Sequence, residues 1–132
     1  MYVEIRSSGI HHLGVFALRS FKTGEVVLRW DTSHRVPAVQ AAEYRDRPGL
    51  YLHPHDAGSF FVVQSPECYV NHSCAHNTEV KDFMDVAVRD IAAGEEITSN
   101  YETDGAGLCF VCRCGAQRCR GVIGAAKAII GT

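Results

Sequence analysis

Asn71-His72-Ser73-Cys74-Ala75-His76-Asn77 is the stretch of this chain that is most informative about its structure. Its seven residues carry two amides, two imidazoles, a hydroxyl and a thiol, directly after the apolar-rich segment Cys68-Tyr69-Val70. If the stretch is buried, these groups need partners, because an unpaired polar group away from water costs roughly 1–3 kcal/mol. A bound ligand or a metal could supply the partners. The alternative is a polar surface turn that contains a cysteine.

Two downstream segments favour the first interpretation. They are Gly94-Glu95-Glu96-Ile97-Thr98-Ser99-Asn100-Tyr101 and Phe110-Val111-Cys112-Arg113-Cys114-Gly115-Ala116-Gln117-Arg118-Cys119-Arg120-Gly121-Val122-Ile123-Gly124. In this order, the three segments resemble the SET-domain lysine methyltransferases with their zinc-binding post-SET tail. The family patterns are N-H-S-C-x-P-N, G-E-E-[LI]-T-x-D-Y and F-x-C-x-C-G-x-x-x-C-R-G-x-I-G. Together with Leu13-Gly14-Val15-Phe16-Ala17 and Gly24-Glu25, the resemblance covers nearly the whole chain, and the short substrate region is similar to that of the small viral and bacterial members.

Composition limits the function classes. A chain of 132 residues is long enough for one domain with its own core. Its net charge of −2 gives no electrostatic reason to expect direct nucleic-acid binding. The first residues contain no long apolar run, so we expect neither a secretory signal nor a membrane span. We therefore expect a cytoplasmic protein, or one in a host nucleus if it acts on histones. Six cysteines in a reducing compartment indicate metal binding or chemistry rather than disulfides.

The hydrophobic pattern predicts a mostly β chain with many short strands and little helix. The expected helix covers residues 37–46, where a proline suits the first turn. A turn is expected at 54–58. The expected strands cover residues 2–6, 13–17, 26–30, 50–52, 59–64, 68–70, 78–83 and 84–91.

The spacing of Cys112, Cys114 and Cys119 predicts three thiolate ligands of a structural zinc site that lacks a fourth. Cys109 could complete a local site through Cys109-x-x-Cys112. The resemblance instead implies Cys74 as the fourth ligand, so that zinc would fasten the tail to the middle of the chain. A structural zinc contributes about 10–16 kcal/mol of apparent binding free energy, so its removal should release the tail.

The resemblance also implies a fold, a division of the chain and a site. The fold would be a SET-domain fold of several small β-sheets with one short helix, over residues 1–107, followed by the zinc-bound post-SET tail, over 108–132. Tyr101 would be the catalytic residue, where it orients the lysine amine and meets the methyl group. The cofactor would be S-adenosylmethionine. Its implied contacts are His12, Leu13, Gly14, Phe16, Tyr51, Asn71, His72, Tyr101 and Phe110.

Two residues depart from the family pattern in ways that bear on function. His12 stands where the cofactor loop usually has a glycine, and a side chain there limits how closely the backbone approaches a ligand. Ser99 stands where the family commonly has Phe or Tyr, so the number of methyl groups transferred is open.

Three functions are consistent with these residues. The first is a protein-lysine methyltransferase that uses S-adenosylmethionine and acts on a lysine-containing protein or peptide such as a histone tail. The second is a zinc-stabilised SET-like module without turnover that binds a peptide or a partner protein. The third is a zinc-ribbon adaptor, which would bind its metal without Cys74. A small domain with a short substrate groove also gains from pairing, so a homodimer is one expected state.

Overall fold

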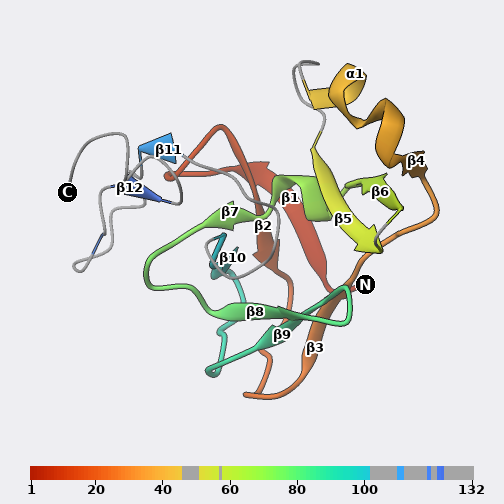
Figure 1. The fold of residues 1–132 in the computed structure, drawn as a ribbon. Helices are drawn as coiled ribbons and strands as arrows, with labels where there is room; N and C mark the ends of the chain where they lie inside the picture. The colour runs from red at the N-terminus through yellow and green to blue at the C-terminus, as the bar shows by residue number, and fades with distance from the viewer. Residues whose placement is uncertain (46–50, 57, 102–109, 112–118, 120–121, 124–132) are drawn as a thin grey trace.

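The computed structural model describes residues 1–45, 51–56, 58–101, 110–111, 119 and 122–123 (Figure 1). Within them the protein is built from short strands arranged in four small sheets, with one α-helix of five residues. The mostly β prediction with one short helix is therefore confirmed. None of the helices in the described part of the chain combines the length and the apolar content needed to cross a membrane.

The largest sheet has the strand order β1-β2-β10-β7. β1 (Val3–Ser7), β2 (Leu13–Ala17) and β10 (Glu96–Ser99) pair in antiparallel fashion, whereas β10 and β7 (Asn71–His72) run parallel. The sheet thus brings together three segments that are far apart in the sequence.

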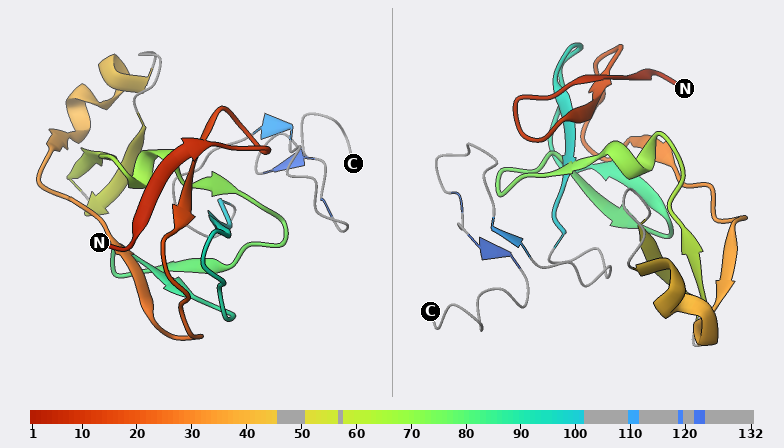
Figure 2. Two further views of the ribbon diagram at one scale, coloured as in Figure 1. Left: turned by 180° about the vertical axis from the view of Figure 1, so that it is seen from behind. Right: turned by 90° about the horizontal axis from the view of Figure 1, so that it is seen from above.

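Three smaller sheets complete the described structure. β3 (Val26–Arg29), β9 (Met84–Ala87) and β8 (Thr78–Lys81) form one, and β4 (Arg35–Pro37), β6 (Ser59–Val62) and β5 (Leu52–Asp56) form another. β11 (Phe110–Val111) pairs with β12 (Val122–Ile123). Figures 1 and 2 place α1 and the β5–β6 hairpin on one side of β7, and β11 and β12 on the other.

Alternating apolar residues of the strands form the core. Val15 and Ala17 of β2 and Ile97 of β10 are buried and meet residues from β3 and β9. This alternation is the period-2 pattern from which the strands were predicted. The buried core residues are Val15, Ala17, Phe21, Val27, Leu28, Val70, Ala87, Ile91 and Ile97.

An aromatic cluster, whose Trp30 also packs against the core, joins the β3-β9-β8 sheet to the β4-β6-β5 sheet. Trp30 meets the His53 ring edge-on at 4.9 Å between centroids, and Phe83 stacks on His55 at 5.3 Å. The indole N–H of Trp30 donates to Oδ2 of Asp85, 3.0 Å away, and Asp85 is fully buried. Burial raises the pKa of the Asp85 carboxyl above its usual range, while hydrogen bonds to Glu67 and Trp30 act to lower it.

The helix was predicted at nearly its observed place. A 3-10 turn, η1 (Ala38–Gln40), leads into α1 (Ala41–Arg45), and Pro37 is the N-cap rather than the first helical residue. The short strand β4 before it was not predicted.

Two strand predictions need correction. Residues 68–70 were expected to be extended, but η2 (Glu67–Tyr69) is a 3-10 turn that Val70 closes with an N–H bond to the Glu67 carbonyl. Pro66 precedes this turn and cannot donate to a strand ladder. The strand expected at 50–52 is β5, which begins at Leu52 and continues through most of the expected turn. It accommodates Pro54 because β5 is an edge strand.

Candidate active site

The parallel pairing of β7 with β10 builds the candidate site. Thr98 pairs with Asn71 and Ser99 with His72, and the Ser73 amide donates to the Ser99 carbonyl at 3.1 Å. Both segments are short, and the backbone N–H and C=O groups of one hydrogen-bond to those of the other. Tyr101, two residues beyond β10, is therefore placed beside the Asn71–Asn77 segment.

Tyr101 is tied to this segment at both ends. Its backbone N–H donates to Nδ1 of His72 at 3.1 Å, and its hydroxyl donates to the Val70 carbonyl. The two rings lie 5.5 Å apart between centroids. Because Nδ1 accepts a hydrogen bond, the neutral imidazole carries its proton on Nε2, which lies 3.5 Å from Sγ of Cys74.

Asn71 ties the same segment to the loop before β2. Its Nδ2 lies 3.0 Å from the Leu13 carbonyl and 3.3 Å from the His11 carbonyl. It also lies 2.9 Å from Oε2 of Glu96 and 3.2 Å from Oγ of Ser8. An amide group has two N–H donors, and here four oxygens surround them. Asn71 thus fixes the 8–13 loop, within which two of the predicted cofactor contacts lie.

His12 adopts a backbone conformation in which glycine is favoured. Its φ is 35°, in the left-handed region that residues with a Cβ rarely adopt. The side chain is exposed, and the carbonyl accepts a hydrogen bond from the Ser8 amide at 2.9 Å. The departure from the family's glycine therefore falls where the backbone geometry calls for one.

The other predicted cofactor contacts lie in several elements. Gly14 and Phe16 are on one face of β2; Phe16 lies under the Arg6 guanidinium, 4.0 Å from its ring centroid, and pairs in register with Glu96. Tyr51 precedes β5 and is 42% exposed. Phe110 lies in β11. Hydrogen bonds join Asn71 to Leu13 and Tyr101 to His72. The roles of all the predicted site residues, including His12, Gly14, Phe16, Tyr51 and Phe110, stay predictions.

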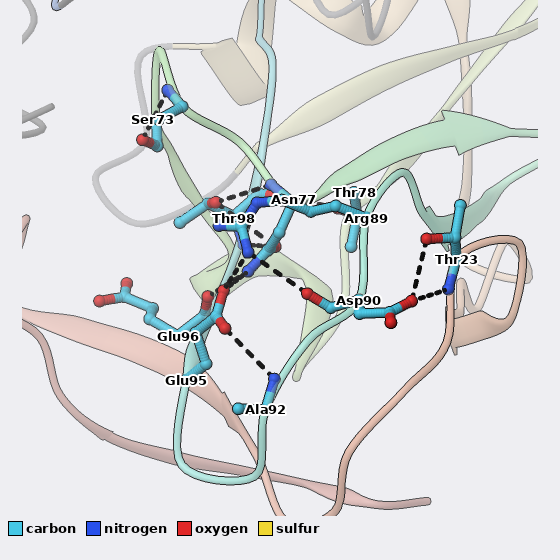
Figure 3. A network of polar contacts seen from close by, with 11 residues as sticks. Thr23, Ser73, Asn77, Thr78, Arg89, Asp90, Ala92, Glu95, Glu96 and Thr98 are labelled. Atoms are coloured by element: carbon cyan, nitrogen blue, oxygen red, sulfur yellow. Dashed lines mark hydrogen bonds and ion pairs between the residues drawn. The ribbon is translucent and has the colours of Figure 1, made fainter. Parts of the chain in front are cut away.

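A polar network that the sequence analysis did not identify holds the Asn77 end of the Asn71–Asn77 segment (Figure 3). The buried Asn77 donates to the Glu96 carbonyl at 2.8 Å and to Oε2 of Glu95 at 3.0 Å, and it accepts from the Thr98 amide at 2.9 Å. Burial opposes ionisation of Glu95, but bonds from Asn77, the Ala92 amide and Arg89 lower the pKa of its carboxyl below the usual range. Both ends of the Asn71–Asn77 segment are thus hydrogen-bonded to β10.

The predicted zinc site lies only partly within the described residues. Thiolates are the donors that Zn²⁺ prefers, and Cys74 and Cys119 are both half-buried. Cys112, Cys114 and the rival ligand Cys109 lie outside the described residues. Inside them, three or more His, Cys, Asp or Glu side chains do not gather in a group that could hold a metal.

Comparison with known proteins agrees with the fold and the motifs. The SET-domain family profile matches residues 12–102. The chain is 28% identical over 135 residues to human histone-lysine N-methyltransferase 2B, 26% over 134 residues to the histone-lysine N-methyltransferase trithorax of Drosophila virilis, and 27% over 136 residues to histone-lysine N-methyltransferase ATX2 of Arabidopsis thaliana. These alignments cover 89%, 90% and 88% of this chain, but only 5%, 4% and 12% of the relatives.

Proposed function

Because this chain belongs to the SET-domain family, we propose that it transfers a methyl group from S-adenosylmethionine to the side-chain amine of a lysine in a protein substrate, with histone tails as the first candidates. The relatives named above are histone-lysine methyltransferases, which supports this substrate class. The observation that carries the proposal is the convergence of Asn71, His72 and Tyr101 around the β7–β10 pair.

The proposed chemistry requires a neutral lysine amine. A lysine has an ordinary pKa of about 10.4, so removing its proton near neutral pH costs roughly 4–5 kcal/mol. A narrow channel that excludes water lowers this cost by disfavouring the charged form. The bound methyl donor would supply an electrophilic methyl group, and the protein would align the amine with it.

Tyr101 has the bonding expected of a group that orients the amine. Its hydroxyl proton is directed to the Val70 carbonyl. The phenol oxygen is then an acceptor, which could receive an N–H of the lysine and leave the nitrogen lone pair for attack. His72 fixes the backbone of Tyr101 from the other side.

Methyl transfer from labelled S-adenosylmethionine to a panel of lysine-rich proteins, including histones, tests the proposal. Tyr101→Phe removes one hydroxyl and should lower kcat/KM about 100-fold or more, the usual contribution of a positioned acid–base group. Tyr2→Phe makes the same chemical change at an exposed tyrosine and should leave the rate unchanged. Equal labelling by wild-type protein and Tyr101→Phe would remove Tyr101 from the mechanism.

The second candidate, a SET-like module without turnover, is favoured by one observation. His12 occupies a left-handed position in the loop that would hold the methyl donor. The two functions are separated by calorimetry with S-adenosylhomocysteine, the demethylated product. A methyltransferase binds it, whereas a module that has lost the donor site does not.

A zinc site of Cys74, Cys112, Cys114 and Cys119 is part of the proposal. It would fix the tail beside the Asn71–Asn77 segment, and the division between residues 107 and 108 is proposed on the same basis. Four thiolates suit a closed, structural site rather than a catalytic one.

A further inference from the structure

The carboxylate of Glu96 connects three segments that are distant in the sequence. The Ser8 hydroxyl lies 2.8 Å from its Oε1 and 2.9 Å from its Oε2, and Nδ2 of Asn71 lies 2.9 Å from Oε2. Successive strand residues point to opposite faces. Figure 3 accordingly shows the Glu96 carboxylate directed away from the Asn77 network, which contains Glu95.

Ser8 links the Glu96 carboxylate to the loop before β2 through hydrogen bonds. Its hydroxyl donates to Glu96, so its oxygen can accept from the loop backbone, and the amides of Ile10 and His11 lie 3.0 Å and 3.4 Å from it. The Ser8 amide bonds to the His12 carbonyl at 2.9 Å. A left-handed residue such as His12 persists only where its surroundings fix it. Glu96 and Ser8 provide that fixation.

Gly14 provides the space that Glu96 needs. A Cβ added at Gly14 would lie 2.5 Å from Oε2 of Glu96, 2.9 Å from its Cδ and 3.0 Å from Cβ of Ser8. No side chain fits there without moving the carboxylate. The approach of Glu96 therefore favours glycine here, since the φ of Gly14 is not in the left-handed region.

We infer that Glu96 is a positioning residue for the methyl donor, acting through Asn71 and the 8–13 loop, and that Gly14 is glycine in order to admit its carboxylate. This inference rests on the proposed function. Asn71 and the loop are the implied donor contacts, and Glu96 is the one side chain in the described residues that bonds to both Asn71 and Ser8. Loss of the charge would leave the loop and Asn71 to rearrange independently.

Glu96→Gln is the sharpest test, because it keeps the size of the side chain and replaces one accepting oxygen with a donor. Hydrogen bonds to charged groups contribute about 1.5–3 kcal/mol, which corresponds to roughly a 10–100-fold change in a dissociation constant. We expect the Kd for S-adenosylhomocysteine and the KM for S-adenosylmethionine to rise by that factor. The KM for the lysine substrate, and kcat at saturating donor, should stay close to wild type.

Glu95→Gln is the matched control, since it changes the neighbouring carboxylate on the other face. It removes the ion pair with Arg89 and weakens the bond from Asn77, so it should lower the unfolding temperature. Because Glu95 bonds to neither Ser8 nor Asn71 in the described residues, the Kd for S-adenosylhomocysteine should rise far less than in Glu96→Gln. Hydrogen exchange adds a direct readout, and the amides of residues 8–13 should exchange faster in Glu96→Gln only. Ser8→Ala removes a single hydroxyl and should also raise the Kd for the donor. It replaces Glu96→Gln as the test if Glu96→Gln does not fold.

The outcomes separate the two proposals. If wild-type protein binds no S-adenosylhomocysteine, the proposed function fails and this inference fails with it. If wild-type protein binds but Glu96→Gln, or in its place Ser8→Ala, binds equally well, the role of Glu96 is refuted and the proposed function stands.

Discussion

At the scale of single residues, His12 is expected to cost stability. A residue with a Cβ pays about 1–2 kcal/mol in the left-handed region. Substitution by glycine removes this strain, but glycine loses more conformational entropy on folding, which offsets about 0.5–1 kcal/mol of the gain. His12→Gly should therefore raise the free energy of unfolding by up to about 1 kcal/mol, as measured by urea denaturation.

His11→Gly is the control for this substitution. It changes the adjacent histidine, whose φ is not positive, so it gains nothing from relieved strain and should be neutral or destabilising. A His12→Gly protein no more stable than His11→Gly would show that the loop holds no such strain.

Single residues also mark the limit of what the sequence could predict at the site. Tyr101 and His72 were predicted together, because each lies in a motif with a known pattern. Ser8 was not, because its partner Glu96 is 88 residues away and no local pattern connects them. Glu96 and Asn77 lay inside the quoted motifs, but their roles depend on which strand face each side chain occupies. That became visible only with the β2–β10 and β7–β10 registers.

At the scale of elements, Asp85 of β9 links the aromatic cluster to η2 and makes stability depend on pH. Its native pKa is raised by burial, so folded protein keeps a proton that the unfolded chain loses above about pH 4. Asp85 therefore contributes most to the free energy of unfolding at low pH, and its contribution falls as the pH rises toward its native pKa. Asp85→Asn removes this dependence and keeps an acceptor for Trp30. At about pH 8 it should be more stable than wild type, because the folded state no longer holds back the ionisation of a buried carboxyl.

Asp90→Asn should change the stability in the opposite direction and be less stable than wild type near neutral pH. The pKa of the exposed Asp90 carboxyl is lowered by bonds from the backbone and hydroxyl of Thr23, so its contribution is present above its ordinary pKa and is lost in acid. Urea unfolding between about pH 3 and about pH 8, a range that includes the ordinary carboxyl pKa of about 4, compares both variants with wild type. An Asp85→Asn protein that is less stable than wild type throughout this range would contradict the assignment.

The elements were predictable where a local rule determined them. Alternating apolar residues identified β1, β2, β3, β8 and β9 to within a few residues. η2 was missed because apolar residues in a three-residue run fit a strand and a turn equally well, and Pro66 decides between them. The parallel pairing of β7 and β10 was not predicted, because two short polar segments carry no register signal of their own.

At the scale of the whole molecule, a zinc ion would connect the tail to the candidate site through Cys74. We predict about one zinc per purified chain, and Cys74→Ser should lose most of it, because a tetrahedral structural site needs all four ligands. Metal content by mass spectrometry is the measurement. Cys74→Ser protein that kept its full zinc content would indicate the local site with Cys109 instead.

Cys68→Ser is the matched control. Burial raises the pKa of the Cys68 thiol, which keeps it protonated and makes it a poor metal ligand. Its replacement should leave the zinc content unchanged. Zinc loss from both variants to the same extent would mean that folding, rather than ligation, had been affected.

Asn71, His72 and Tyr101, which β7 and β10 bring together, are proposed to bind the methyl donor. Calorimetric titration of the wild-type protein with S-adenosylhomocysteine measures this binding. We predict saturable binding at one site per chain, accompanied by a rise in unfolding temperature with ligand concentration. The absence of both binding heat and thermal stabilisation would contradict the claim.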